Sequence, residues 1–266
     1  MKQLFRYFIF VLLILLTGCG KQPETLQKNS SSEDINSSIE LTKDVKALNI
    51  KLDSGNINIF CWDKPDIKCE IKHTIRDYQT DDQLAKLLKK FSAETKIESS
   101  ICSIDVKYKG KVRDSQDIYS EVKLTIPKRV KELTIYQDAG SLTVEDKYQG
   151  GINAELDKVN AEIRSLYGLL KLKCEEGNIR LNSGKLSNDS QVKVGSGNIH
   201  IKSACQNNSS YSFQTKAGNI DLAFPKESPI NLDVFGTVTN NQFTGMDGSI
   251  TVNASTNIGK ISVNGY

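Results

Sequence analysis

Residues able to do acid–base chemistry are few and scattered in this chain of 266 residues. Its two histidines, His73 and His200, lie far apart in the sequence. Neither sits in a pattern that supplies a nucleophile and an orienting carboxylate, as nucleophilic hydrolysis requires. His73 continues the apolar phase of the residues before it and is expected at the inner margin of a strand. His200 alternates outward between Ile199 and Ile201, so we expect it to face solvent.

Three aspartates, Asp53, Asp138 and Asp247, precede glycines at similar offsets. A row of carboxylates binds a cation, or cleaves a glycan when it is paired with a second acid or a base in one groove. Aspartate is also a common turn residue, and we favour that interpretation. Arg164 and Arg180 are expected to point outward, but no spacing singles them out. We therefore predict no catalytic set, no metal site and no cofactor. A β-helical carbohydrate-active enzyme, a polysaccharide lyase or hydrolase, stays open as the alternative.

Five of the six cysteines follow the apolar phase of their surroundings. Because five is odd, they cannot form a complete set of disulfides. Small buried hydrophobic side chains are the favoured interpretation, although a bridge across the turn between Cys61 and Cys69 stays open. No CxxC motif is present, so neither a zinc site nor a thioredoxin-like site is supported. The five are Cys61, Cys69, Cys102, Cys174 and Cys205.

The sixth cysteine, Cys19, ends a segment with the anatomy of a secretory signal. Lys2 and Arg6 precede an apolar run over residues 8–16, which is short for a membrane span. The following Leu16-Thr17-Gly18-Cys19 resembles the bacterial lipoprotein signal, in which the cysteine is acylated and becomes the mature N-terminus. The resemblance implies a signal peptide at 1–18, an acyl anchor such as palmitate on Cys19, and a place on the extracytoplasmic face of a bacterial membrane.

Residues 19–44 are rich in Ser, Asn, Gln, Lys and Glu and contain few apolar side chains. Such a composition cannot bury a core, so we expect a lipidated, flexible tether. The formal charge of the whole chain is +3, and part of it belongs to the signal segment. The near-neutral remainder argues against a nucleic-acid partner.

The elements that must position these residues follow from a repeated unit of glycine, a polar residue and alternating apolar residues. Glycine supplies a positive φ at a corner, and the alternation turns one face of a strand inward. Recurrence at spacings near ten or its multiples predicts an all-β, solenoid-like stack of short strands over 45–266. The expected structural corners are Gly55, Gly140, Gly177, Gly197, Gly218, Gly248 and Gly259.

One segment breaks this alternation. Leu84, Leu87, Leu88 and Phe91 have helical spacing, and Thr80 with Gln83 forms a capping-box signature. We predict a single amphipathic helix at about 80–91, which covers an end or a side of the strands.

Asparagine often follows the corner glycine, as at Asn56, Asn178, Asn198 and Asn219. In stacked units these side chains would occupy equivalent positions and could hydrogen-bond along the stack; local satisfaction of each turn is the favoured alternative. Residues 160–163 look like another copy with Ala161 in the place of glycine.

The repeats resemble the bacterial putative-adhesin family of Gly-(Asp/Asn)-Ile repeat β-helical domains. The match is carried by residues 52–57, 125–128, 194–199, 215–220 and 259–263. The resemblance implies a cell-surface domain without an agreed activity, in some members linked to envelope stress. We expect a non-catalytic adhesin-like or scaffold module that binds an envelope protein, a peptide or a wall polymer. The preference for Asn over Asp after glycine weakens a calcium-binding interpretation.

Overall fold

The computed structural model describes residues 27–243 and 248–266, and within them the chain is all-β with one short helix. The glycine-led alternation of the sequence produces these strands, because it gives each of them one apolar face. The elements are β1 (Asn29–Ile39), β2 (Ala47–Trp62), β3 (Ile67–Asp77), α2 (Asp81–Leu88), β4 (Phe91–Glu98), β5 (Ile101–Tyr108), β6 (Asp117–Pro127), β7 (Glu132–Gln149), β8 (Gly151–Gly168), β9 (Leu170–Glu176), β10 (Ile179–Leu181), β11 (Gly184–Leu186), β12 (Gln191–Ser196), β13 (Ile199–Lys202), β14 (Ala204–Cys205), β15 (Ser209–Ala217), β16 (Ile220–Phe224), β17 (Ile230–Asn241) and β18 (Ile250–Gly265).

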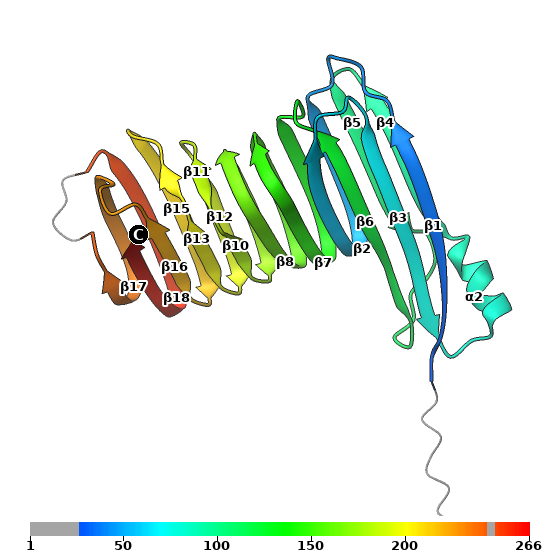
Figure 1. Cartoon of the computed structure of the whole chain (residues 1–266). Helices are drawn as coiled ribbons and strands as arrows, with labels where there is room; N and C mark the ends of the chain where they lie inside the picture. The colour runs from blue at the N-terminus through cyan, green and yellow to red at the C-terminus, as the bar shows by residue number, and fades with distance from the viewer. Residues whose placement is uncertain (1–26, 244–247) are drawn as a thin grey trace, which may run out of the picture.

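Successive passes of the chain lie side by side along an elongated body (Figure 1). We call the strands before the glycine corners the first wall: β5, β9, β12, β15 and the first halves of β2, β7, β8 and β18. The second wall follows the corners: β6, β10, β13, β16 and the second halves of the same four long strands. Pairing along both walls is parallel and in register.

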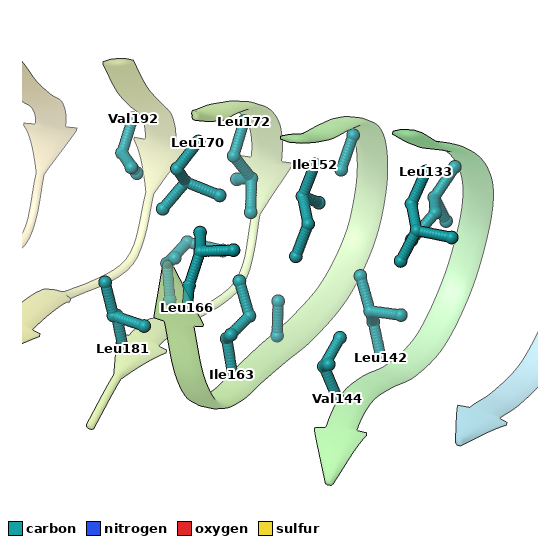
Figure 2. Close-up of a cluster of buried hydrophobic side chains, with 14 of the residues drawn as sticks. Leu133, Leu142, Val144, Ile152, Ile163, Leu166, Leu170, Leu172, Leu181 and Val192 are labelled. Atoms are coloured by element: carbon teal, nitrogen blue, oxygen red, sulfur yellow. The ribbon is translucent and has the colours of Figure 1, made fainter. Parts of the chain in front are cut away.

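Inward side chains of the two walls meet in one apolar core (Figure 2). Leu133, Ile152 and Leu170 on the first wall face the same interior as Leu142 and Ile163 on the second, and each is at most 1% exposed. Burying one such side chain contributes roughly 1.5–3 kcal/mol. The repeated layers of these residues are therefore the main source of stability.

The expectation of a solenoid-like stack of short strands is wrong. β7 and β8 are each 18 residues long and β2 and β18 each 16, because these strands keep pairing through their corners. They join both walls into one continuous sheet of 18 strands around the core. β1, β3 and β4 add antiparallel pairs at one end. Alternation along the sequence marks which side chains point inward, but it does not mark where a strand ends.

Part of the expected flexible tether at 19–44 is a strand instead, while its residues 19–26 lie outside the described residues. Residues 29–39 form β1, which pairs antiparallel with all of β3. Only Ile35 and Ile39 of this strand pack against the core. An edge strand needs little apolar surface because its backbone hydrogen bonds to one neighbour and its outer edge faces water. The polar composition of this segment therefore concealed a strand.

The amphipathic helix is present as α2, shorter than the predicted 80–91. Gln83 Oε1 accepts from the backbone N–H of Thr80 at 3.1 Å, which is one half of the expected capping box. Leu84 and Leu88 pack against Ile75, and Phe91 already belongs to β4. Within the described residues, no helix has the length and apolar character needed to cross a membrane.

Six of the seven expected corner glycines have positive φ, between 119° and 151°; Gly248 does not. Gly168, Gly184 and Gly236 adopt the same conformation. The proposed copy at 160–163 is offset by two residues from its expected register. Val159, rather than Ala161, lies opposite Gly140 in the corner position, and Ala161 occupies the first inward position, opposite Leu142.

Candidate binding face

The outward side chains of the second wall form a regular polar surface, which we call the polar face. Adjacent strands of a sheet lie about 4.8 Å apart, so each in-register set of residues makes a column across the wall. One column follows the glycine corners directly, and a second lies two residues further along each strand. Two columns two residues apart point to the same side of a strand.

The first column is an asparagine ladder. Asn160 Oδ1 accepts from the backbone N–H and from Nδ2 of Asn178, at 2.9 and 3.1 Å. Asn178 Oδ1 receives the same pair from Asn198, both at 3.0 Å. Asn198 Oδ1 then accepts from the N–H of Asn219 at 2.8 Å. Each amide thus binds the next strand rather than its own turn. At Asn56 the ladder reaches Ser141, whose Oγ lies 2.8 Å from Asn56 Oδ1.

The second column carries the charges. Glu162, Arg180, His200 and Asp221 stand in register on four successive strands. His200 Nδ1 lies 2.8 Å from Asp221 Oδ2, and Asp221 Oδ1 accepts from Asn264 Nδ2 at 3.1 Å. Arg180 is exposed and stands in register with Glu162 on one neighbouring strand and with His200 on the other.

The two histidines have different surroundings. His200 points outward, as predicted, and it has a carboxylate partner in Asp221. The hydroxyl residues of the same column, Ser262 and Thr143, stand in register with Asp221 and Glu162 rather than with His200. The other histidine, His73, is buried as expected, at 1% exposure. Its Nδ1 lies 2.8 Å from Ser120 Oγ and its ring stacks on Phe91 at 4.2 Å. Burial lowers the pKa of His73, against a smaller opposing effect from Glu33.

The five cysteines within the described residues are free, and all are buried except Cys61, which is half-buried. The open alternative of a Cys61–Cys69 bridge is therefore not realised. Burial raises the pKa of Cys69 and Cys102 to about 11 and that of Cys205 to about 12. Because the thiolate is the nucleophile and the metal ligand, these thiols are suited to packing.

The aspartates singled out from the sequence do not converge. Asp53 Oδ2 accepts from the backbone N–H of Tyr108 at 3.2 Å, which is a structural role. Asp138 is exposed on the first wall, and Asp247 lies outside the described residues. In the ranges 27–243 and 248–266, no three His, Cys, Asp or Glu side chains are grouped to hold a metal. Arg164 points outward and pairs with Glu145 at 2.8 Å.

A pocket of about 460 Å³ lies where β5 and β6 meet the corner of β2. Its wall is largely apolar, with Phe91, Val106 and Ile118, and its polar rim includes Lys107 and Asp117. Lys107 already pairs with Asp105 at 2.6 Å, and Asp117 with Lys28 at 3.0 Å. The rim charges are therefore committed to internal ion pairs.

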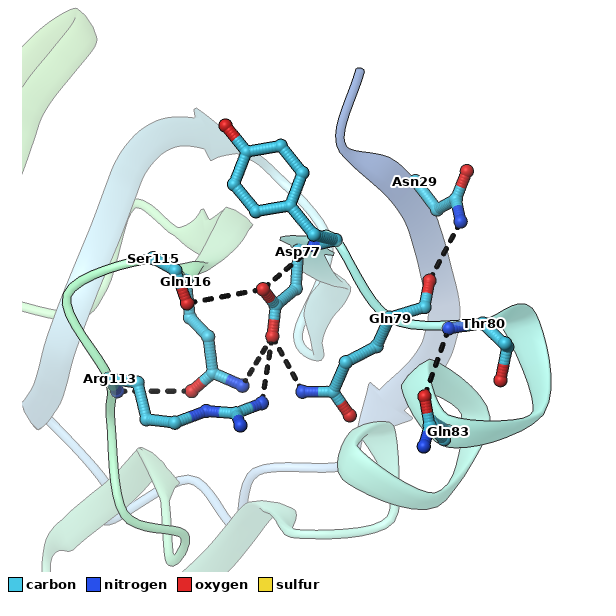
Figure 3. A network of polar contacts seen from close by, with 9 residues as sticks. Asn29, Asp77, Gln79, Thr80, Gln83, Arg113, Ser115 and Gln116 are labelled. Carbon is cyan, nitrogen blue, oxygen red and sulfur yellow. Dashed lines mark hydrogen bonds and ion pairs between the residues drawn. The ribbon is translucent and has the colours of Figure 1, made fainter. Parts of the chain in front are cut away.

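Among the described residues, the carboxylate of Asp77 accepts the largest set of hydrogen bonds, and it lies beside α2 (Figure 3). It accepts from the backbone N–H of Tyr78 at 2.8 Å and from the side chains of Gln79, Arg113, Ser115 and Gln116 at 2.6, 2.9, 3.2 and 3.0 Å. Burial alone would raise the pKa of Asp77, but these hydrogen bonds and the Arg113 charge outweigh it and lower the pKa. The network ties the end of β3 to the loop at 109–116 and is structural.

Sequence reasoning missed the pairing of His200 with Asp221 and the column they share with Arg180. Each residue follows a corner glycine at the same offset, so the repeat itself held the signal once the units are aligned. The Asp77 network left no comparable signal, because its partners come from a polar loop without a repeat.

Residues 120–238 match the family model described as Toastrack DUF4097. A putative adhesin from Parabacteroides distasonis is similar at 15% identity, with 90% of this chain and 97% of that chain covered and a TM-score of 0.43. A putative adhesin from Bacteroides fragilis is similar at 12% identity, 88% and 98% coverage and a TM-score of 0.41. A putative cell adhesion protein from Clostridium sporogenes is similar at 13% identity, 89% and 100% coverage and a TM-score of 0.35. No curated protein sequence matches the chain significantly.

Proposed function

We propose that the protein is a non-catalytic lipoprotein of the bacterial cell surface, whose polar face binds an extended partner in an adhesin-like or scaffolding role. The partner class is a wall polymer, an envelope peptide or a neighbouring membrane protein. The observation that carries the proposal is the in-register column of Glu162, Arg180, His200 and Asp221.

A column of this kind suits an elongated ligand. Steps of about 4.8 Å between strands present donors and acceptors at regular intervals along one direction. The asparagine ladder fixes the neighbouring column, since its amides are held by the next strand, so little side-chain entropy is lost when a ligand binds. Arg180 supplies a fork of donors that matches a carboxylate or a phosphate.

The lipid anchor is part of the same proposal. Its support is the Leu16-Thr17-Gly18-Cys19 motif, which lies outside the described residues. Attachment at Cys19 would hold the polar face outside the cell, within reach of wall polymers and envelope proteins.

The binding role is tested with purified peptidoglycan, wall glycans and a library of extended peptides. We compare the parent chain with Arg180→Ser and with Lys193→Ser, a matched change of an exposed cation on the first wall. Loss of a charge-assisted contact costs about 1.5–3 kcal/mol, so Arg180→Ser is expected to weaken binding at least about tenfold. Lys193→Ser should leave binding unchanged.

If Arg180→Ser binds as tightly as Lys193→Ser and the parent chain, the binding surface lies elsewhere on the protein. Turnover of any glycan in the panel, abolished by a single carboxylate substitution that preserves the fold, would assign the protein to the enzymes instead.

A further inference from the structure

The described chain enters the body beside α2 and the loop at 109–116 (Figure 1). Lys28 Nζ pairs with Asp117 at 3.0 Å, directly after that loop. Asn29 Nδ2 donates to the carbonyl of Gln79, just before α2, at 2.7 Å. The segment that carries Cys19 therefore joins the body at this end.

The strand β1 sets how far this end can lie from a membrane. It starts at Asn29, so only the residues between Cys19 and Asn29 separate the proposed acyl chains from the folded body. Even a fully extended chain of that length reaches at most about 35 Å. If the proposed lipid attachment holds, on which this inference rests, the α2 end stays close to the bilayer surface.

The surface chemistry of this end fits that position. We call residues 86–90, at the end of α2, and the loop at 109–113 the basic tip. Lys109 N–H donates to the carbonyl of Lys90 at 2.9 Å, which holds the two segments together. Val112 is 64% exposed at the loop, with a cation on each side. The exposed cations of the basic tip are Lys86, Lys89, Lys90, Lys109, Lys111 and Arg113.

Of these six cations, only Lys109 and Arg113 form ion pairs within the described residues. Asp114 lies in the loop itself, and Asp81 and Asp82 lie in the first turn of α2, one helix length away. Glu94 pairs with Lys109 at 3.1 Å. Asp77 pairs with Arg113 and also accepts hydrogen bonds from Ser115 and Gln116 (Figure 3). These contacts fix the base of the loop, while Val112 is 64% exposed at the edge of the pocket beside β5 and β6.

We propose that the basic tip docks on anionic lipid head groups, with Val112 at the head-group boundary. Each lysine near an anionic leaflet strengthens binding about fivefold, and salt weakens the attraction by screening. A covalent anchor raises the effective concentration of the basic tip at the membrane. A few cations are therefore enough to hold the tip on anionic head groups. The body is then held at its α2 end, and β17 and β18 extend away from the bilayer.

The test uses the full, lipid-modified chain with Trp62→Phe, reconstituted in vesicles of brominated phosphatidylcholine with or without brominated phosphatidylglycerol. Val112→Trp introduces a fluorescent reporter at the basic tip. Val238→Trp, a substitution of a 41% exposed valine on β17, is the matched control at the far end. With phosphatidylglycerol present, we expect the tryptophan emission of the Val112→Trp variant to be quenched several-fold more than that of the Val238→Trp variant. High salt or the triple change Lys86→Ala, Lys89→Ala and Lys111→Ala should remove that difference.

Three outcomes overturn the proposal. Equal quenching of the two reporters, in protein that sediments with the vesicles, shows that the tip does not dock. Equal quenching of the Val112→Trp variant with and without phosphatidylglycerol shows that anionic head groups are not the partner. Protein that fails to sediment at all overturns the lipid attachment, and the docking with it, so the two failures are distinguishable. Urea midpoints equal to that of the parent chain verify that the variants are folded.

Discussion

The carbonyl oxygen of Gly197 lies where a β-carbon on Gly218 would stand: an ideal Cβ there would be 2.0 Å from that oxygen. Gly218 also has φ of 149°. The corners of two successive passes thus approach so closely that only glycine fits at position 218. The stacking of the walls depends on such contacts, since the distance between corners sets the distance between strands.

Gly218→Val is therefore expected to destabilise the fold strongly. Backbone strain at a position of this kind costs about 1–3 kcal/mol, and the clash with a backbone atom adds to it. We expect a loss of at least about 3 kcal/mol in the free energy of unfolding, measured by urea denaturation. Lys216→Val, an exposed change two residues away, should stay within about 0.5 kcal/mol of the parent chain. Similar urea midpoints for the two variants would contradict a steric requirement at this corner.

A second prediction concerns the buried carboxylate of Asp77. Asp77→Ala leaves the donors of Gln79, Gln116 and Ser115 without their acceptor, and we expect a loss of about 2 kcal/mol at pH 7. The folded-state pKa of Asp77 is lowered, so the ionised carboxylate stabilises the fold above the unfolded pKa of about 3.9. That contribution is lost as the pH falls through the folded-state pKa.

The check is urea denaturation of parent and variant from pH 7 down to pH 3. The difference in the free energy of unfolding between the parent chain and Asp77→Ala should become smaller as the pH approaches 3. A difference that stays constant over this range would mean that the charge of Asp77 contributes nothing.

The inward faces of the strands could be predicted from the sequence, whereas the extent and the partners of the strands could not. Ile199 and Ile201 are buried and His200 faces outward, as alternation requires. β1 escaped prediction because its stability comes from pairing with β3, a contact that leaves no local pattern in a polar segment.

In the candidate site too, the sequence predicts which way a side chain points but not which residues it stands beside. The outward position of His200 and Arg180 follows from local alternation. Their shared column with Asp221 depends on the register between strands some twenty residues apart, and the glycine corners fix that register only once the passes are stacked.

The thiols offer a third prediction. With pKa values near 11 for Cys69 and Cys102, the thiolate fraction at neutral pH is about 300-fold below that of a free cysteine with a pKa of about 8.5. Iodoacetamide should label these thiols at least that much more slowly in the folded protein than in urea, with Cys205 slower still. Labelling of the folded chain at the rate of a free thiol, read at each cysteine by peptide mass spectrometry, would show that the cysteines are not packed.

The last prediction concerns Cys19 and the membrane. If this residue is acylated, the protein produced in a bacterial host should fractionate with membranes and carry no fast-reacting thiol at its N-terminus. Cys19→Ser should release the protein or leave an uncleaved precursor, because a lipoprotein signal requires the thiol as the site of acylation. Two or more acyl chains give stable anchoring where one gives only reversible binding, so the membrane fraction of the parent chain should resist washing with high salt.

Thr17→Ser, a conservative change two residues earlier, serves as the matched control and should leave processing and fractionation intact. Membrane retention and cleavage of the Cys19→Ser variant equal to those of the parent chain would contradict lipid attachment. In that case a plain secretory signal would account for residues 1–18, and the α2 end would lose its link to the bilayer.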